Sequence, residues 1–185
     1  MNKYKNINNP EQLFKFMKEN IKYGWVTNKR VVANDKNDMW KEYILLSPSE
    51  VLSYGIGTCT DQVEYQRDFF ETHNYLFYTY FIQVKRQKDW PGHAFLIYKS
   101  GNKWYWFEHA WEAYQGIHEF NTKEEVLDYV TQSFIKHCSV LKCENNDFYL
   151  SSYDKLIPGI NHSDIQKAVY NNMRNEINER KVVYN

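Results

Sequence analysis

The first regular hydrophobic pattern of the chain follows Pro10, where apolar residues recur at the spacing of an α-helix. They are Leu13, Phe14, Met17 and Ile21. Residues three and four positions apart lie on one face of a helix, so we expect this face to pack against a core. Glycine is common just after a helix end. The pattern therefore predicts an amphipathic helix from Pro10 to about Tyr23-Gly24.

Two further helices are predicted on either side of a glycine-containing turn. Ser47-Pro48-Ser49-Glu50 has the form of a capping box with proline at the first helical position, so a short helix should run to about Tyr54. The segment Gly55-Ile56-Gly57 interrupts it. Thr58 can then cap a second helix, which we expect to extend to about Thr72.

From residue 75 the spacing of apolar residues changes to that of β-strands. Segments rich in aromatic and β-branched residues predict strands at 75–84, 93–99 and 103–109. Ser100-Gly101-Asn102-Lys103 predicts a tight hairpin turn between the last two. Shorter strands are expected at 116–120 and 148–151.

Two helices follow in the C-terminal part of the chain. Asn121 begins the first, whose inward face is predicted to consist of Val126, Leu127, Val130 and Phe134. The second is a charged amphipathic helix over about 163–179. The order of helices, then a meandering sheet, then helices predicts an α+β fold, in which helices pack against an antiparallel sheet within a single domain, 1–185.

The composition agrees with a packed domain. Of the 185 residues, 43% are hydrophobic and 18% aromatic, which argues against disorder. Lys+Arg (23) equals Asp+Glu (23), so the chain lacks the basic surface expected of a nucleic-acid partner. No apolar run approaches the roughly 18 residues of a membrane span, and no apolar leader follows Met1. We therefore expect neither nucleic acid nor membrane as a partner.

The three cysteines, Cys59, Cys138 and Cys143, are an odd number and form no disulfide framework. A reduced, cytoplasmic protein is the expectation, with export by a leaderless route as the alternative. His137-Cys138 and Cys143 fit no regular zinc spacing, so we predict no metal there.

Cys59 is placed where a helix begins, directly after Gly57-Thr58. There its sulfur lies near unpaired backbone N–H groups and the positive end of the helix dipole, which both favour a thiolate. The same N–H groups could stabilise the oxyanion of a tetrahedral intermediate. The structural alternative is a buried core cysteine, a common environment for this residue.

His93 and Glu108 are predicted to lie on one face of the hairpin. The tight turn pairs Ser100 with Lys103, and the same register places Phe95 opposite Glu108. Side chains alternate with period two, so Glu108 becomes a diagonal neighbour of His93, roughly 7–8 Å away between backbones. His109 then points to the other face, and a single bulge would reverse this assignment.

A thiol, an imidazole and a carboxylate have complementary roles in acyl transfer. The imidazole takes the thiol proton and later gives one to the leaving group, while the carboxylate fixes the tautomer of the imidazole and supports its charged form. Taken singly, His93 and Glu108 also fit ordinary positions at strand ends. Their coincidence on one face, downstream of a cysteine that opens a helix, favours a joint catalytic role.

These residues resemble the transglutaminase-like cysteine enzyme superfamily. The resemblance consists of Gly57-Thr58-Cys59 at a helix start, His93-Ala94-Phe95 opening a strand and Trp106-Phe107-Glu108 closing the next. Asp61-Gln62-Val63-Glu64 and the stretch from Trp106 to Trp111 are similar to a small uncharacterised bacterial branch. The resemblance implies a papain/transglutaminase-like core over about 47–120, with Cys59 as nucleophile, His93 as general base and acid, and Glu108 as the orienting carboxylate.

The chain departs from that superfamily in two respects. The usual third residue is aspartate, and Glu108 is longer. A side-chain donor for the oxyanion is not marked by any spacing; Trp40, Tyr54 and Gln62 are candidates, and Asp61 is a candidate supporting residue. Nothing resembles the calcium sites of the larger animal transglutaminases, so we expect no metal and no cofactor.

The expected function is acyl transfer through a Cys59 thioester, with a protein, peptide or small amide as substrate. Water as the last nucleophile gives a protease or amidase, and an amine gives a transglutaminase-type reaction; the sequence does not distinguish them. Two alternatives are a binding module that keeps the fold without turnover, and acetyl transfer by analogy to arylamine acetyltransferases. The sequence leaves the oligomeric state open.

Overall fold

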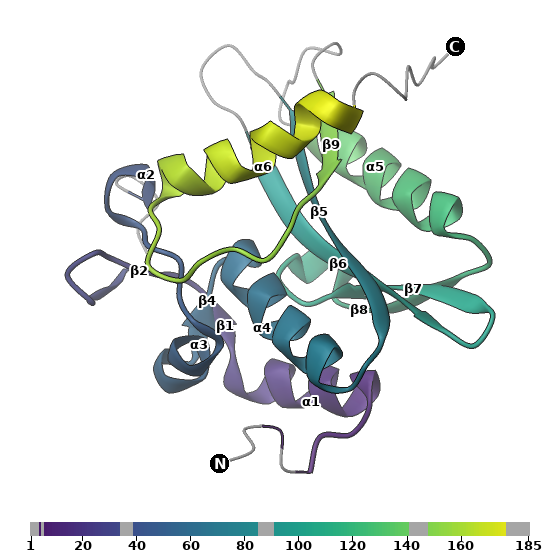
Figure 1. The fold of residues 1–185 in the computed structure, drawn as a ribbon, viewed down its shortest axis with the longest axis horizontal. Helices are drawn as coiled ribbons and strands as arrows, with labels where there is room; N and C mark the ends of the chain where they lie inside the picture. The colour runs from purple at the N-terminus through teal and green to yellow at the C-terminus, as the bar shows by residue number, and fades with distance from the viewer. Residues whose placement is uncertain (1–3, 5, 34–38, 85–90, 141–147, 177–185) are drawn as a thin grey trace.

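A five-stranded antiparallel sheet forms the centre of the structure, in the order β8-β7-β6-β5-β9 (Figure 1). The computed structural model describes residues 4, 6–33, 39–84, 91–140 and 148–176. The strands are β5 (Leu76–Val84), β6 (Gly92–Ser100), β7 (Lys103–Glu108), β8 (Gly116–Phe120) and β9 (Phe148–Ser152). Strands β5 to β8 follow one another as a meander, and β9 pairs with the free side of β5.

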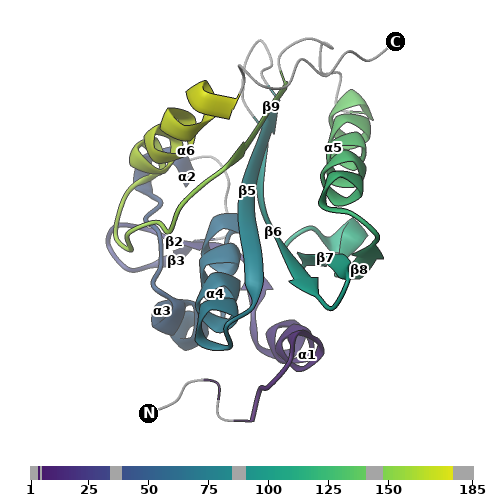
Figure 2. The same ribbon diagram turned by 45° about the vertical axis from the view of Figure 1, so that its right-hand side comes forward.

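Helices cover both faces of this sheet (Figure 2). Helices α4 (Cys59–Thr72) and α6 (His162–Glu176) lie on one side, and α5 (Lys123–Val140) lies on the other. Helix α1 (Pro10–Asn20) lies beside β8. The fold is therefore α+β, as predicted, with an antiparallel sheet between helical layers.

Two core clusters form where the helices meet the sheet. The first, on the α4 side, contains Ala94, Leu96 and Tyr98 of β6. The second, on the α5 side, contains Phe95 and Ile97 of the same strand. Because alternate residues of β6 enter different cores, the strand is apolar almost throughout rather than alternating with polar residues.

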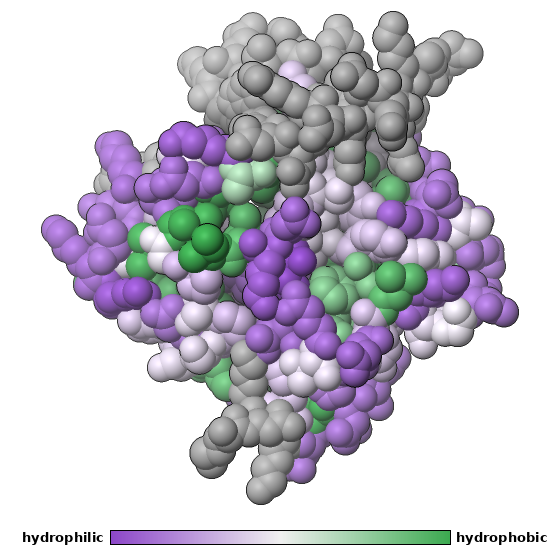
Figure 3. Space-filling model, viewed as in Figure 1, coloured by the Kyte–Doolittle hydropathy of each residue, from purple (hydrophilic) through white to green (hydrophobic). Residues whose placement is uncertain are grey.

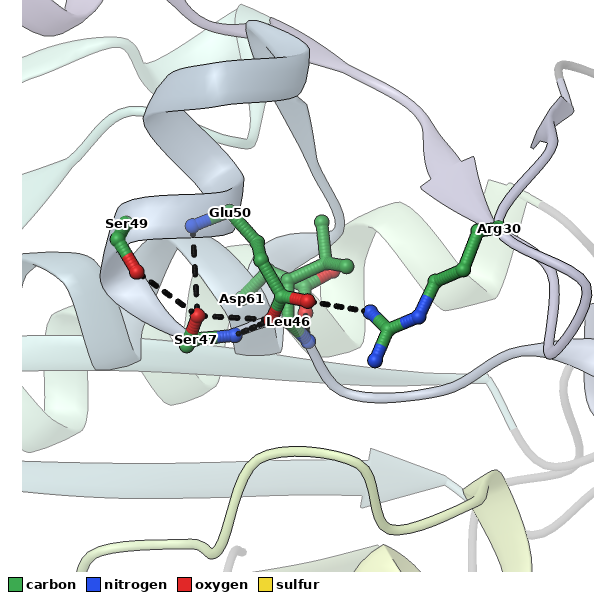
Figure 4. Close-up of polar contacts among 6 residues, drawn as sticks. All are labelled: Arg30, Leu46, Ser47, Ser49, Glu50 and Asp61. Atoms are coloured by element: carbon green, nitrogen blue, oxygen red, sulfur yellow. Dashed lines mark hydrogen bonds and ion pairs between the residues drawn. The ribbon is translucent and has the colours of Figure 1, made fainter.

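Local capping interactions determine where the helix before the Gly55-Ile56-Gly57 turn begins and ends. In α3 (Pro48–Tyr54), the Ser47 Oγ accepts a hydrogen bond from the Glu50 N–H (3.3 Å), while the Glu50 carboxylate accepts one from the Ser47 N–H (2.8 Å) (Figure 4). Arg30 pairs with the other oxygen of Glu50 at 2.5 Å. The helix ends at Gly55, whose φ of 64° is left-handed and favours glycine. The predicted limits of α3 and α4 are confirmed.

The N-terminal helix is shorter than predicted. Helix α1 ends at Asn20, and Lys22–Tyr23 forms strand β1, which pairs in parallel with β4 (Ile56–Gly57). The prediction of helix to Tyr23-Gly24 was wrong because this pairing with a distant segment overrides the helical pattern. The remaining elements here are short: β2 (Trp25–Val26), β3 (Val32–Ala33), α2 (Met39–Glu42) and the 3₁₀ helix η1 (Glu112–Tyr114).

The other predicted elements are confirmed to within a few residues, except for the predicted end of the last helix at about 179, which lies outside the described residues. The four apolar residues predicted for the inward face of α5 are all buried, and α6 begins at His162, one residue before the predicted start.

From the side of Figure 1 the surface is mainly hydrophilic and carries two hydrophobic patches (Figure 3). Within the described part of the chain, no helix has both the length and the apolar character needed to cross a membrane.

Candidate active site

Cys59 is the first residue of α4, and its turn is fixed by reciprocal capping. The Thr58 Oγ1 accepts a hydrogen bond from the Asp61 N–H at 3.3 Å, and the Asp61 carboxylate accepts one from the Thr58 N–H at 2.8 Å. Gly57 is required because a Cβ there would lie 2.9 Å from the Asp61 Cβ. Cys59 is half-buried, so the residue is not sealed within the core.

The hairpin has the predicted register, with Ser100 opposite Lys103 and Leu96 opposite Phe107. No bulge interrupts these pairs, and Glu108 therefore emerges on the same face as His93. The His93 Nε2 lies 2.7 Å from the Glu108 Oε2. Both side chains are buried, at 7% and 2% exposure respectively. The extra methylene of glutamate is thus compatible with a direct hydrogen bond to the imidazole.

The second oxygen of Glu108 and the rings around His93 fix the pair further. The Glu108 Oε1 accepts a hydrogen bond from the Trp111 N–H at 2.7 Å. The Trp111 ring meets the imidazole edge-on with 5.4 Å between centroids, and Phe95 stacks with it at 6.4 Å. A carboxylate held at both oxygens is suited to orienting an imidazole.

The charges of the site favour a protonated His93. Burial by itself lowers the pKa of His93, but the Glu108 carboxylate and a hydrogen bond with Cys59 outweigh it and raise the pKa from 6.5 to about 10. Because Nε2 is engaged by Glu108, Nδ1 is the ring nitrogen available to the thiol. At neutral pH the arrangement therefore favours an imidazolium beside the sulfur.

The three groups come together at the ends of the inner strands β6 and β7. His93 packs with Phe95 in the second core cluster, on the α5 side, whereas Cys59 packs with the first cluster, on the α4 side. They meet where β6 begins and β7 ends. The sequence indicated that His93 and Glu108 share a face, but not that the thiol approaches from the helix covering the opposite face.

Gln62, a candidate oxyanion donor, connects the Cys59 turn to the end of β7. Its Nε2 donates to the Gly57 carbonyl at 2.8 Å, and its Oε1 lies 2.6 Å from the His109 Nδ1. Burial lowers the pKa of His109, so its ring is neutral and its Nδ1–H donates to Gln62. The amide of Gln62 is thus engaged in holding the turn, and His109 points away from Glu108 as predicted.

Asp61, the candidate supporting residue, accepts four hydrogen bonds although it is fully buried. The Tyr43 hydroxyl (2.9 Å) and the Leu46 N–H (2.8 Å) donate to Oδ1. The Thr58 N–H (2.8 Å) and hydroxyl (2.9 Å) donate to Oδ2. Burial raises the pKa of Asp61 to about 6, although these four donors oppose the shift. The carboxylate joins the start of α4 to the segment before α3.

We expect Asp61→Asn to lower the free energy of unfolding by about 2–4 kcal/mol, because an amide accepts at only one atom and its NH₂ group would face two donors. Urea unfolding followed by circular dichroism measures this. The exposed Glu124 of α5 provides a matched control, since Glu124→Gln makes the same chemical change without burial. Equal stabilities of the two variants would contradict a structural role for Asp61.

Of the other two candidate oxyanion donors, the structure describes the side chain of Tyr54 alone. Tyr54 is half-buried in the last turn of α3 and packs against the first core cluster. Trp40 belongs to the short helix α2, but its side chain lies outside the part of the chain described here.

Two tyrosines near the thiol were missed by the sequence analysis. Tyr43 supports the Cys59 turn through the Thr58 hydroxyl (3.1 Å) and Asp61. Tyr23 lies in β1 beside β4, and the pKa of its hydroxyl is raised, with the charge of Cys59 as the largest cause. Both tyrosines are many residues away in sequence from the turn they approach, so the local sequence gave no indication of either contact.

The predicted absence of a metal site concerns His137, Cys138 and Cys143. Cys138 is buried in α5, and the His137 ring lies 5.3 Å from the Trp111 ring. Cys143 lies outside the described residues. Among the residues that the structure describes, no group of three or more His, Cys, Asp and Glu side chains is arranged to hold a metal ion.

Comparison of the chain with family models, with curated proteins and with solved structures gives no match. What can be inferred about function therefore comes from the geometry of its own residues: a cysteine at a helix start, and a buried imidazole hydrogen-bonded to a carboxylate beside it.

Proposed function

We propose that this protein is a thiol-dependent acyl-transfer enzyme acting on an amide or peptide. In this proposal Cys59 is the nucleophile, His93 the general base and acid, and Glu108 the orienting carboxylate. The observation that carries it is the 2.7 Å contact between His93 and Glu108, with the other side of the imidazole available to Cys59 at the start of α4.

The reaction begins when the Cys59 sulfur attacks the substrate carbonyl. A C–S bond forms while the π-electron pair moves onto oxygen. When the carbonyl re-forms, the C–N bond breaks and the His93 imidazolium gives its proton to the departing ammonia or amine. Water or a second amine then attacks the thioester, and His93 takes the proton of that nucleophile; the C–S bond breaks, its electron pair returns to the Cys59 sulfur, and the acyl product leaves. Hydrolysis and transamidation differ only in this last step.

The local electrostatics support each role. The backbone N–H groups and dipole of the first turn of α4 favour negative charge on the sulfur and on a nearby oxyanion. Glu108 favours a positive His93, which is the form that donates to the leaving group. The chemistry also requires a free thiol, so the proposal includes a reducing, cytoplasmic location. The proposal includes the family that the motifs resemble: the enzyme would be a transglutaminase-like protein with a papain/transglutaminase-like core.

Alkylation by iodoacetamide tests the proposal without knowledge of the substrate. Near pH 6, Cys59 should react at least about tenfold faster than N-acetylcysteine, because the imidazolium stabilises the thiolate when most free thiols are protonated. His93→Ala should remove this advantage. Mass spectrometry of the Cys59 peptide gives the rate at this site separately from Cys138 and Cys143.

His162→Ala is a suitable control, because His162 lies at the start of α6 and should leave the Cys59 rate unchanged. If Cys59 reacts no faster than N-acetylcysteine, and equally in the two histidine variants, the acyl-transfer proposal fails. The binding-module alternative would then be preferred.

A further inference from the structure

Tyr23 lies next to the segment that carries Cys59 although 35 residues separate Tyr23 from Cys59 in the sequence. Strand β1 pairs in parallel with β4, with Tyr23 opposite Gly57. The Lys22 N–H donates to the Gly55 carbonyl (2.9 Å), and the Gly24 N–H to the Gly57 carbonyl (3.3 Å). These two bonds fix the backbone of Tyr23 beside the turn that leads into Cys59.

The side chain of Tyr23 points toward the start of α4. Residues directly paired between two strands project to the same face of the pair. A Cβ at Gly57 would meet the Cβ of Asp61 (2.9 Å) and the Cγ of Gln62 (3.4 Å), which lie in the first turn of α4. Tyr23, on the same face, is therefore directed to the turn that begins with Cys59.

Tyr23 is also accessible to solvent, unlike the other tyrosines whose pKa is raised in part by the charge of Cys59. It is 50% exposed, whereas Tyr43 and Tyr153 are 2% and 4% exposed. Tyrosines buried to this extent offer little surface to a substrate held at the sulfur. Tyr23 is half-exposed and close enough for the charge of Cys59 to raise its pKa, so it is accessible to a molecule bound beside the thiol.

The hydroxyl of Tyr23 keeps its proton. Its pKa is raised above 10 by the negative charge of Cys59, then by the burial of the unexposed part of its side chain and by the charge of Asp61. A phenol that stays protonated beside developing negative charge acts as a hydrogen-bond donor throughout the neutral range.

We propose that Tyr23 is a further catalytic residue, whose hydroxyl donates a hydrogen bond to the oxyanion formed when Cys59 attacks a carbonyl. This inference rests on the proposed acyl-transfer function and supplies the side-chain donor for which Trp40, Tyr54 and Gln62 were candidates. The Tyr23 hydroxyl does not lose its proton. It donates a hydrogen bond while the oxyanion carries negative charge, and this hydrogen bond weakens when the carbonyl re-forms and the leaving group departs.

The test compares two reactions of the same sulfur. Acylation by p-nitrophenyl acetate passes through a tetrahedral oxyanion, whereas alkylation by iodoacetamide does not. Tyr23→Phe, which removes only the hydroxyl, should lower the rate constant for acylation of Cys59 by about 10²-fold, the usual effect of losing one oxyanion donor. It should leave the alkylation rate unchanged within about twofold. Circular dichroism melting verifies that the variant is folded.

Tyr129 of α5 provides the matched control, since it is 43% exposed on a helix covering the other face of the sheet. Tyr129→Phe should leave both rates unchanged. An equal fall of acylation and alkylation in Tyr23→Phe would overturn the inference, because Tyr23 would then act on the thiol; so would the absence of any fall. If the wild-type alkylation rate itself shows no advantage over N-acetylcysteine, the proposed function fails, and this inference fails with it.

Discussion

Replacing His93 with glutamine is expected to lower kcat/KM for acyl transfer by about 10³-fold or more while leaving the protein folded. In the wild type the Glu108 Oε2 lies 2.7 Å from the His93 Nε2. In the variant, a glutamine N–H can still donate a hydrogen bond to this oxygen. An amide, however, neither takes up the thiol proton nor protonates a leaving amine. The measurement is Cys59-dependent cleavage of a chromogenic amide or amine incorporation into a glutamine peptide, beside thermal melting of the same samples.

His93→Ala is the necessary companion variant. It should lose activity to a similar extent but also stability, because it leaves the buried Glu108 carboxylate without its charged partner, a change that commonly costs about 3–5 kcal/mol. Loss of activity in both variants, with loss of stability mainly in His93→Ala, separates chemistry from folding. A glutamine variant with wild-type kcat/KM would show that His93 is not the general base and acid.

Glu108→Gln is expected to have the second largest effect, lowering kcat/KM by about 10²–10⁴-fold. The amide oxygen can still accept from the Trp111 N–H, but the NH₂ group then faces the His93 Nε2. That contact favours the tautomer with its proton on Nδ1, which cannot accept the thiol proton. Single-turnover acylation and the pH dependence of kcat/KM are the measurements.

The pH profile should change in a defined direction. In the wild type the imidazolium is present below its pKa of about 10 and is lost as the pH rises through that value, so activity that needs the acid should fall there. Glu108 is the strongest cause that raises this pKa. In Glu108→Gln the alkaline limb should therefore move to lower pH, whereas an unmoved limb would mean that Glu108 does not control the charge of His93.

The raised pKa of His93 also predicts that the stability of the folded protein depends on pH. Because the pKa of His93 is higher in the folded state, its charged pair with Glu108 stabilises the fold fully below about pH 6.5, and this contribution is lost as the pH rises toward about 10. The melting temperature of the wild type should fall over that range by more than that of Glu108→Gln.

The hairpin carrying His93 and Glu108 was predictable because its register depends on adjacent residues. The two-residue turn at Gly101-Asn102, where Gly101 has a φ of 57°, pairs Ser100 with Lys103. Strict alternation along two unbulged strands then sets the face of every later residue. The capping boxes at Ser47 and Thr58 were predictable for the same reason, since each involves residues only three positions apart.

Strand β1 and the residues around the thiol were not predictable in this way. Lys22–Tyr23 becomes a strand only because Ile56–Gly57 lies beside it, so the local pattern extended α1 too far. The contact of Tyr43 with Asp61 likewise joins two segments through a hydrogen bond that neither segment indicates alone.

The sequence by itself thus determined the helix that begins at Cys59, the strands and the shared face of His93 and Glu108, because these follow from interactions over a few residues and from the period of a strand. Only the tertiary structure decided that Cys59 meets the imidazole at the ends of strands β6 and β7, and that Tyr23 lies beside the same turn. Those contacts depend on how separate layers pack, and a local pattern of side chains carries no information about the angle or position at which two layers meet.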